Sequence, residues 1–182
     1  MGHPMQTGGG MQPIFPGIYP WHPPAEDFHG RPSQPDYLPA AAPAPPPVTD
    51  YGGRPFVVNI ENAAEQNDLF RTALWTGSHL QVTLMSIPPG EDIGLEVHPN
   101  TDQFLRLEDG EGLVQMGSSP DRLDYRMPVS DDDAIFVPAG TWHNLTNTGR
   151  EPIRLYSIYA PPNHPFGTVH RTKSEAEEAE GH

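Results

Sequence analysis

The segment from Pro88 to Gly112 reads PPGEDIGLEVHPNTDQFLRLEDGEG. Apolar and polar residues alternate over residues 93–98, and this period of two predicts a strand. Glu96 and His98 are two residues apart, so their side chains share one face of that strand. The next four residues, Pro-Asn-Thr-Asp, have the chemistry of a tight turn, and a second apolar run begins at Gln103. We therefore expect three side chains with metal-ligating atoms to gather around one turn.

A second segment offers a further ligand. Ala134–Val137 is short and apolar, which predicts a strand. The sequence Pro-Ala-Gly-Thr interrupts it, and residues 142–147 resume an extended pattern. If the strands curl into a barrel, His143 can face Glu96, His98 and Gln103.

These segments resemble the two motifs of the cupin superfamily, whose members are small β-barrels with a metal in the mouth. The first motif of that family is Gly, five residues, His-x-His, three or four residues, Glu, six residues and Gly. Here the same spacing joins five positions: Gly90, Glu96, His98, Gln103 and Gly110. Glu96 replaces the first His and Gln103 replaces the Glu.

The second cupin motif is Gly, five residues, Pro-x-Gly, two residues, His, three residues and Asn. The chain matches that spacing at five positions: Asp132, Pro138, Gly140, His143 and Asn147. Asp132 replaces the first Gly. The resemblance covers residues 56–165 and implies an all-β protein with a single cupin barrel, a double-stranded β-helix or jelly roll.

The ligand set implied by the resemblance is one carboxylate, two imidazoles and one carboxamide: Glu96, His98, His143 and Gln103. Two His and one carboxylate suit one divalent transition metal, namely Fe, Mn, Ni, Co or Zn. Gln103 is either a fourth, weak ligand or the partner of a metal-bound water. The alternative is a polar mouth without metal, in which Glu96 and His98 hydrogen-bond each other.

Composition divides the chain into three parts. Residues 1–55 hold 14 of the 24 prolines and lack apolar periodicity, which predicts a disordered arm rich in Pro and Gly. Residues 56–165 form the expected barrel. Residues 166–182 form an acidic extension, either a short helix capped by Thr172 or Ser174 or a frayed end.

The net charge of −14 argues against binding to nucleic acids or anionic membranes, because both need basic patches. There is no cysteine and no apolar run long enough to cross a membrane. No secretory signal is visible, so a cytoplasmic location is expected. The expected partner is a small-molecule ligand, and a homodimer is an open alternative.

Several other elements are predicted. Residues 55–60 suggest a first strand, and residues 60–67 a short helix capped by Asn59 or Asn62. Strands are also expected at residues 70–76, 79–87, 123–129 and 153–159. Both faces of the strand at 79–87 carry apolar residues, so the pattern leaves its inward face undetermined. His164 and His170 either lie on the surface, which we favour, or cover the mouth of the site.

Three classes of function remain open. The first is a metal-dependent enzyme of oxygenase type that acts on a small molecule. The second resembles cupin-type phosphomannose isomerases, which use two His, one Glu and one Gln around zinc. A sugar phosphate needs a cationic clamp, however, and the single lysine, Lys173, is far from the motifs. The third is a non-catalytic binding or structural module, such as a surface or coat protein.

Overall fold

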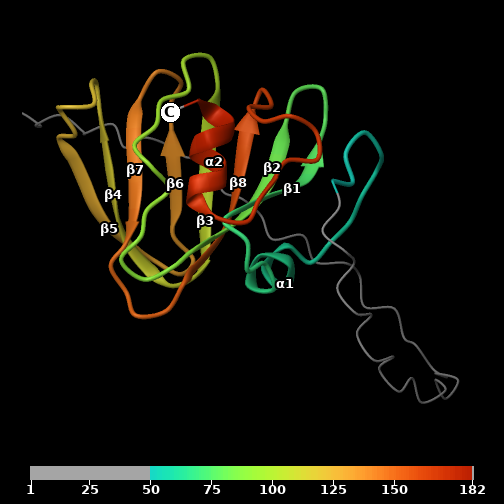
Figure 1. The fold of residues 1–182 in the computed structure, drawn as a ribbon, viewed down its shortest axis with the longest axis horizontal. Helices are drawn as coiled ribbons and strands as arrows, with labels where there is room; N and C mark the ends of the chain where they lie inside the picture. The colour runs from blue at the N-terminus through green and yellow to red at the C-terminus, as the bar shows by residue number, and fades with distance from the viewer. Residues whose placement is uncertain (1–49, 182) are drawn as a thin grey trace, which may run out of the picture. The chain divides into compact units, whose positions relative to one another are not determined.

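The computed structural model describes residues 50–181, which form two antiparallel β-sheets and two α-helices (Figure 1). The larger sheet has the strand order β6-β3-β8-β2-β1-β9, and the smaller sheet has the order β5-β4-β7. The strands of the larger sheet are Ala134–Val137 (β6), Asp102–Asp109 (β3), Ile153–Ala160 (β8), Gln81–Ile87 (β2), Arg71–Thr76 (β1) and Val169–His170 (β9). Those of the smaller sheet are Tyr125–Ser130 (β5), Glu111–Gly117 (β4) and Trp142–Asn147 (β7). The all-β cupin fold expected from the sequence is confirmed.

The main core lies between the two sheets. The larger sheet contributes Met85, Leu107 and Leu155, which stand in register across adjacent strands. Val114 and Leu145 face them from the smaller sheet. Alternate residues of each strand point inward, and this period of two gives β8 its regular alternation of buried and half-buried side chains.

Strand β2 is buried on both faces, which explains why its inward face could not be read from the sequence. Thr83 and Met85 belong to the inward set, whereas Leu84 packs on the outside beneath helix α1, Ile60–Glu65. The side chain of Asn59 accepts a hydrogen bond from the Asn62 amide at 2.9 Å, so the predicted helix and its cap are confirmed.

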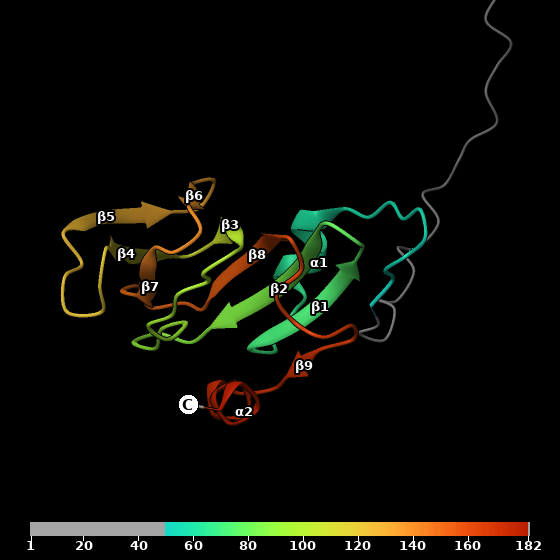
Figure 2. The same ribbon diagram turned by 90° about the horizontal axis from the view of Figure 1, so that it is seen from above.

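Helix α2, Lys173–Glu180, lies on the opposite side of the larger sheet from α1 (Figure 2). Thr172 caps its N-terminus by accepting from the Glu175 amide. Ala176 is buried in the main core between the sheets. The acidic C-terminal segment is thus a helix that closes one side of the core.

Two predicted strands are wrong. Residues 55–60 pair with no strand, and the exposed fraction of Val57 is 96%. The predicted strand at 93–98 makes one isolated bridge to β7, at Glu96, and the preceding residue Asp92 makes another. Gly94 has φ 92°, a left-handed conformation that interrupts a regular strand ladder. Residues 93–98 therefore do not form a strand, although apolar and polar residues alternate along them.

The first described residues contact the barrel. The Asp50 carboxylate accepts hydrogen bonds from Thr76 Oγ1 at 2.6 Å and from the Gly167 amide at 2.9 Å. The predicted division into an arm at 1–55, a barrel at 56–165 and an extension at 166–182 stays a prediction, and most of the arm lies outside the described residues. Within residues 50–181, no helix is long and apolar enough to cross a membrane.

Candidate metal centre

Glu96 and His143 are brought together by backbone pairing. The Glu96 amide donates to the His143 carbonyl at 3.0 Å, and the His143 amide donates to the Glu96 carbonyl at 2.9 Å. Residues opposed in this way across an antiparallel pair point their side chains to the same face. This one isolated bridge therefore aims a carboxylate and an imidazole into the barrel.

The turn of the second motif holds the first motif in place. The Gly140 amide donates to the His98 carbonyl at 2.9 Å, and the Ala139 amide donates to Asp102 Oδ1 at 2.8 Å. Gly140 has φ 78°, which glycine adopts at little cost. The Pro-Ala-Gly turn thus fixes the position of His98 relative to His143.

The three side chains form a compact donor set. Glu96 Oε1 lies 3.4 Å from His98 Nε2 and 3.3 Å from His143 Nε2. One ligand atom of each residue lies within 4.8 Å of the other two, so the cluster could hold a metal ion. Both histidines are buried and Glu96 is half-buried.

The ligand atoms that face one another have no hydrogen-bond partner among the described residues, which suits them to bind a shared ion. Among the described residues, Glu96 Oε1, His98 Nε2 and His143 Nε2 are buried without a hydrogen-bond partner. His143 Nδ1 lies 3.0 Å from the Thr141 carbonyl, to which it donates in the tautomer that leaves Nε2 a free lone pair. The donor set therefore fits a divalent transition metal.

Gln103 lies beside this cluster on β3. Its Nε2 donates to Ser157 Oγ and to the Tyr159 hydroxyl, both at 3.1 Å. These two bonds leave Oε1 buried and unpaired within the described part of the chain. The role predicted for Gln103, as fourth ligand or water partner, stays a prediction.

Arg71, which the sequence analysis missed, adds a buried cation. Its Nη2 lies 3.7 Å from Glu96 Oε2, and its Nη1 lies 2.5 Å from Glu180 Oε1. Its side chain is only 1% exposed. The signal in the sequence was an arginine at the start of a predicted strand, two residues before Ala73 and hence on the same face.

The charges of this cluster shift the pKa of two groups. Burial alone would raise the pKa of Glu96, but the imidazoles of His143 and His98 and the charge of Arg71 hold it well below its usual range. Burial alone would lower the pKa of Arg71, but the nearby Tyr159, Glu96 and Glu180 raise it. The carboxylate is therefore ionised, as a metal ligand must be.

The side chains of Tyr159 and His164 pack behind the Glu-His-His cluster. The Tyr159 ring makes edge contacts with His98 and His164, with centroids 5.5 Å and 4.9 Å apart. Burial raises the pKa of Tyr159 to about 12, so its hydroxyl stays protonated. The favoured surface position of His164 is wrong, because the residue is 8% exposed and packs behind Tyr159. His170 is half-buried.

A two-sheet β-barrel with a Glu-His-His cluster at the two paired motifs is the arrangement of a cupin with a candidate metal site. The chain belongs to the cupin family: residues 83–159 match the model of the Cupin domain. Protein YrkC of Bacillus subtilis is 68% identical over 125 residues, which are 69% of this chain and 67% of YrkC. Protein L612 of Acanthamoeba polyphaga mimivirus is 36% identical over 63% of this chain and 70% of its own.

A solved structure agrees with this assignment. The crystal structure of BH2720 from Bacillus halodurans superposes with a TM-score of 0.71 and 66% sequence identity. The match covers 72% of this chain and 99% of BH2720.

Proposed function

We propose that the protein is a metal-dependent cupin enzyme of oxygenase type that acts on a small molecule. Glu96, His98 and His143 would hold one divalent ion, with Gln103 as a fourth ligand or as the partner of a water. The observation that carries the proposal is the set of three buried, unpaired ligand atoms within 4.8 Å of one another.

The residue types favour this chemistry over simple structural packing. Two histidines and one carboxylate are the ligand set that non-haem Fe(II) oxygenases use, with positions left open for substrate and oxygen. When bound, the ion would supply Lewis acidity and, as iron, one-electron chemistry. The neutral Gln103 keeps the set at one negative charge, so the ion retains more positive charge than beside two carboxylates.

One observation favours the phosphomannose isomerase-type alternative, namely a cation beside the cluster. Arg71 now stands next to Glu96, where the sequence had suggested no cation. However, Glu96 and Glu180 already neutralise this arginine, and Lys173 pairs with Asp92 at 2.6 Å. A dianionic phosphate would therefore meet more acids than bases, and the oxygenase-type function remains our proposal.

Metal analysis and an oxygen-uptake screen test the proposal. The untagged full chain should carry about one transition metal ion per barrel, while His98→Ala and His143→Ala should lose it. His79→Ala is the matched control, because His79 is exposed on a turn away from the cluster. Oxygen consumption with small organic substrates should follow the metal content. Equal metal in all four proteins would contradict the metal site, and metal without oxygen uptake would point to another reaction or to a binding module.

A further inference from the structure

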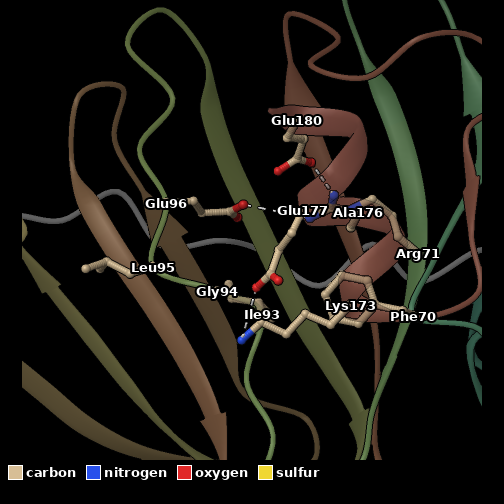
Figure 3. Close-up of a pocket in the computed structure, with 10 residues that line it drawn as sticks. All are labelled: Phe70, Arg71, Ile93, Gly94, Leu95, Glu96, Lys173, Ala176, Glu177 and Glu180. Carbon is tan, nitrogen blue, oxygen red and sulfur yellow. Dashed lines mark hydrogen bonds and ion pairs between the residues drawn. The ribbon is translucent and has the colours of Figure 1, made fainter. Parts of the chain in front are cut away.

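Arg71 is a cation held inside the protein by two carboxylates. Glu180 at the end of α2 contacts Nη1, and Glu96 of the metal cluster lies near Nη2 (Figure 3). In the part of the chain that the structure describes, Arg71 Nε is buried without a hydrogen-bond partner. A guanidinium presents paired donors that match the two oxygens of a carboxylate. Its surroundings therefore leave donor capacity for an anion beside the cluster.

The two end residues of α2, the helix that supplies Glu180, carry charges of the unfavourable sign for the helix dipole, whereas Glu175 in the first turn carries the favourable one. Lys173 is the first residue of α2 and Glu180 the last, whereas the helix dipole favours anions at the N-terminus and cations at the C-terminus. The helix has only eight residues, too few for stability on its own. Glu180 itself is 32% exposed. Its contact with Arg71 is therefore one that a competing carboxylate can replace, because Glu180 would simply return to water.

A small cavity leads to the same arginine. It has a volume of about 100 Å³ and lies between α2 and the segment 93–96 (Figure 3). Its lining combines four apolar side chains, those of Phe70, Ile93, Leu95 and Ala176, with two cations and three carboxylates: Arg71, Lys173, Glu96, Glu177 and Glu180. Ligand pockets are usually at least about 300 Å³, so only a very small molecule fits while Glu180 stays in place. Movement of the end of α2 would enlarge the space.

We propose that Arg71 is the anchor for the carboxylate of a small organic acid, and that Glu180 occupies this position in the structure as a displaceable substitute. Glu96 lines the same cavity and belongs to the metal cluster, so a ligand anchored at Arg71 lies next to the candidate metal centre. The apolar part of the lining, Phe70, Ile93, Leu95 and Ala176, favours an acid with a compact apolar body. The role of this ligand as substrate rests on the proposed function, whereas its binding to Arg71 does not require metal.

The test compares carboxylates with their neutral amides. Acetate and benzoate, with acetamide and benzamide as controls, are titrated calorimetrically into the full-length wild type and Glu180→Gln. Removal of the competing carboxylate should tighten acetate or benzoate binding by about fivefold or more, the range of typical coupling between sites, and leave the amides unbound. Amide hydrogen exchange of α2 should speed up when the acid binds to the wild type, because Glu180 leaves Arg71.

Glu177→Gln is the matched control, because Glu177 lines the same cavity from the same helix but pairs with Lys173 at 3.9 Å. Its carboxylate affinity should equal that of the wild type. Arg71→Lys keeps the charge but loses the paired donors, so it should weaken binding in the Glu180→Gln background. Equal affinities in wild type, Glu177→Gln and Glu180→Gln would overturn the proposal.

Each titration is repeated after chelator treatment. Binding that persists without metal supports the Arg71 site even if the metal proposal fails. If binding is lost after metal removal and its affinity is unchanged in Arg71→Lys, the carboxylate binds the ion instead. That result would overturn the anchor role of Arg71.

Discussion

Gln103 stands directly opposite Tyr159 in the pairing of β3 with β8, and its Nε2 donates to the Tyr159 hydroxyl at 3.1 Å. The same nitrogen donates to Ser157 Oγ, so the amide group is oriented by two hydroxyls. Its free Oε1 is therefore held in one direction. Gln103, one of the three departures from the cupin motifs, is thus fixed by the strand register, and its replacement is a sharp test of the candidate metal centre.

We expect Gln103→Glu to tighten divalent-metal binding, because a second anionic oxygen would join Glu96 near the ion. Without metal, the two carboxylates would repel each other, raise the pKa of one of them and lower the free energy of unfolding by about 1–3 kcal/mol near neutral pH. Calorimetric titration with Mn, Fe, Ni and Zn measures the first effect, and urea unfolding of the metal-free protein measures the second.

Gln81→Glu is the matched control for a buried carboxylate. Both ends of the Gln81 side chain are already used, since Nε2 donates to Thr76 and His164 while Oε1 accepts from backbone amides. This variant should lose stability without any gain in metal affinity. Unchanged affinity for every metal in Gln103→Glu would mean a three-ligand site that excludes Gln103.

Asp132 should tolerate glycine better than alanine. It takes the motif position at which the family has glycine, and its φ of 69° is left-handed. Alanine and glycine both remove the ion pair with Arg106, so the difference between the two variants isolates the backbone. Thermal or urea unfolding should show Asp132→Ala less stable than Asp132→Gly by ~1 kcal/mol. Equal stabilities would contradict a left-handed conformation at this position.

His164 should make the fold sensitive to acid. Burial and the charge of Arg71 lower its pKa from about 6.5 to about 3. In the unfolded chain His164 therefore takes up a proton below about pH 6.5, whereas in the folded protein it does so only near pH 3. Stability from this residue is complete above pH 6.5 and falls by about 1.4 kcal/mol per pH unit as the pH drops through this window.

Urea unfolding from pH 7.5 to 4.5 measures this dependence. His164→Gln should reduce the slope of unfolding free energy against pH on the acid side. Lost packing against Tyr159 would lower the stability equally at every pH and would not change this slope. His79→Gln, which changes an exposed histidine, should give a curve parallel to that of the wild type. A parallel curve for His164→Gln as well would show that His164 takes up its proton in the folded state.

The arm can be tested by deletion at two points. Deletion of residues 1–49 should leave the melting temperature unchanged, because the composition of this part predicts no core packing. Deletion of residues 1–55 should lower the melting temperature by roughly 5 °C, because it removes Asp50, which accepts hydrogen bonds from Thr76 and Gly167. A large loss on the shorter deletion would show that the arm packs as part of the folded domain.

Much of the cupin fold and of the metal cluster could be predicted from the sequence. The cluster of Glu96, His98 and His143 was predicted from the resemblance to the cupin motifs, whose spacing reflects local geometry, namely a turn and a glycine at positive φ. The caps at Asn59 and Thr172 were also predictable, since a cap depends on residues three positions apart. Local spacing failed at residues 55–60, where an apolar run has no partner strand.

Only the tertiary structure revealed the contacts of Arg71. Its partner Glu180 is 109 positions away in the sequence, and no periodicity connects a strand near the start of the barrel to the last residue of a terminal helix. The same holds for His164, which is buried because Tyr159 and α2 pack over it. Pairings of this kind depend on where the sheets and α2 lie in space, so local sequence patterns fix the Glu-His-His cluster while long-range packing decides what surrounds it.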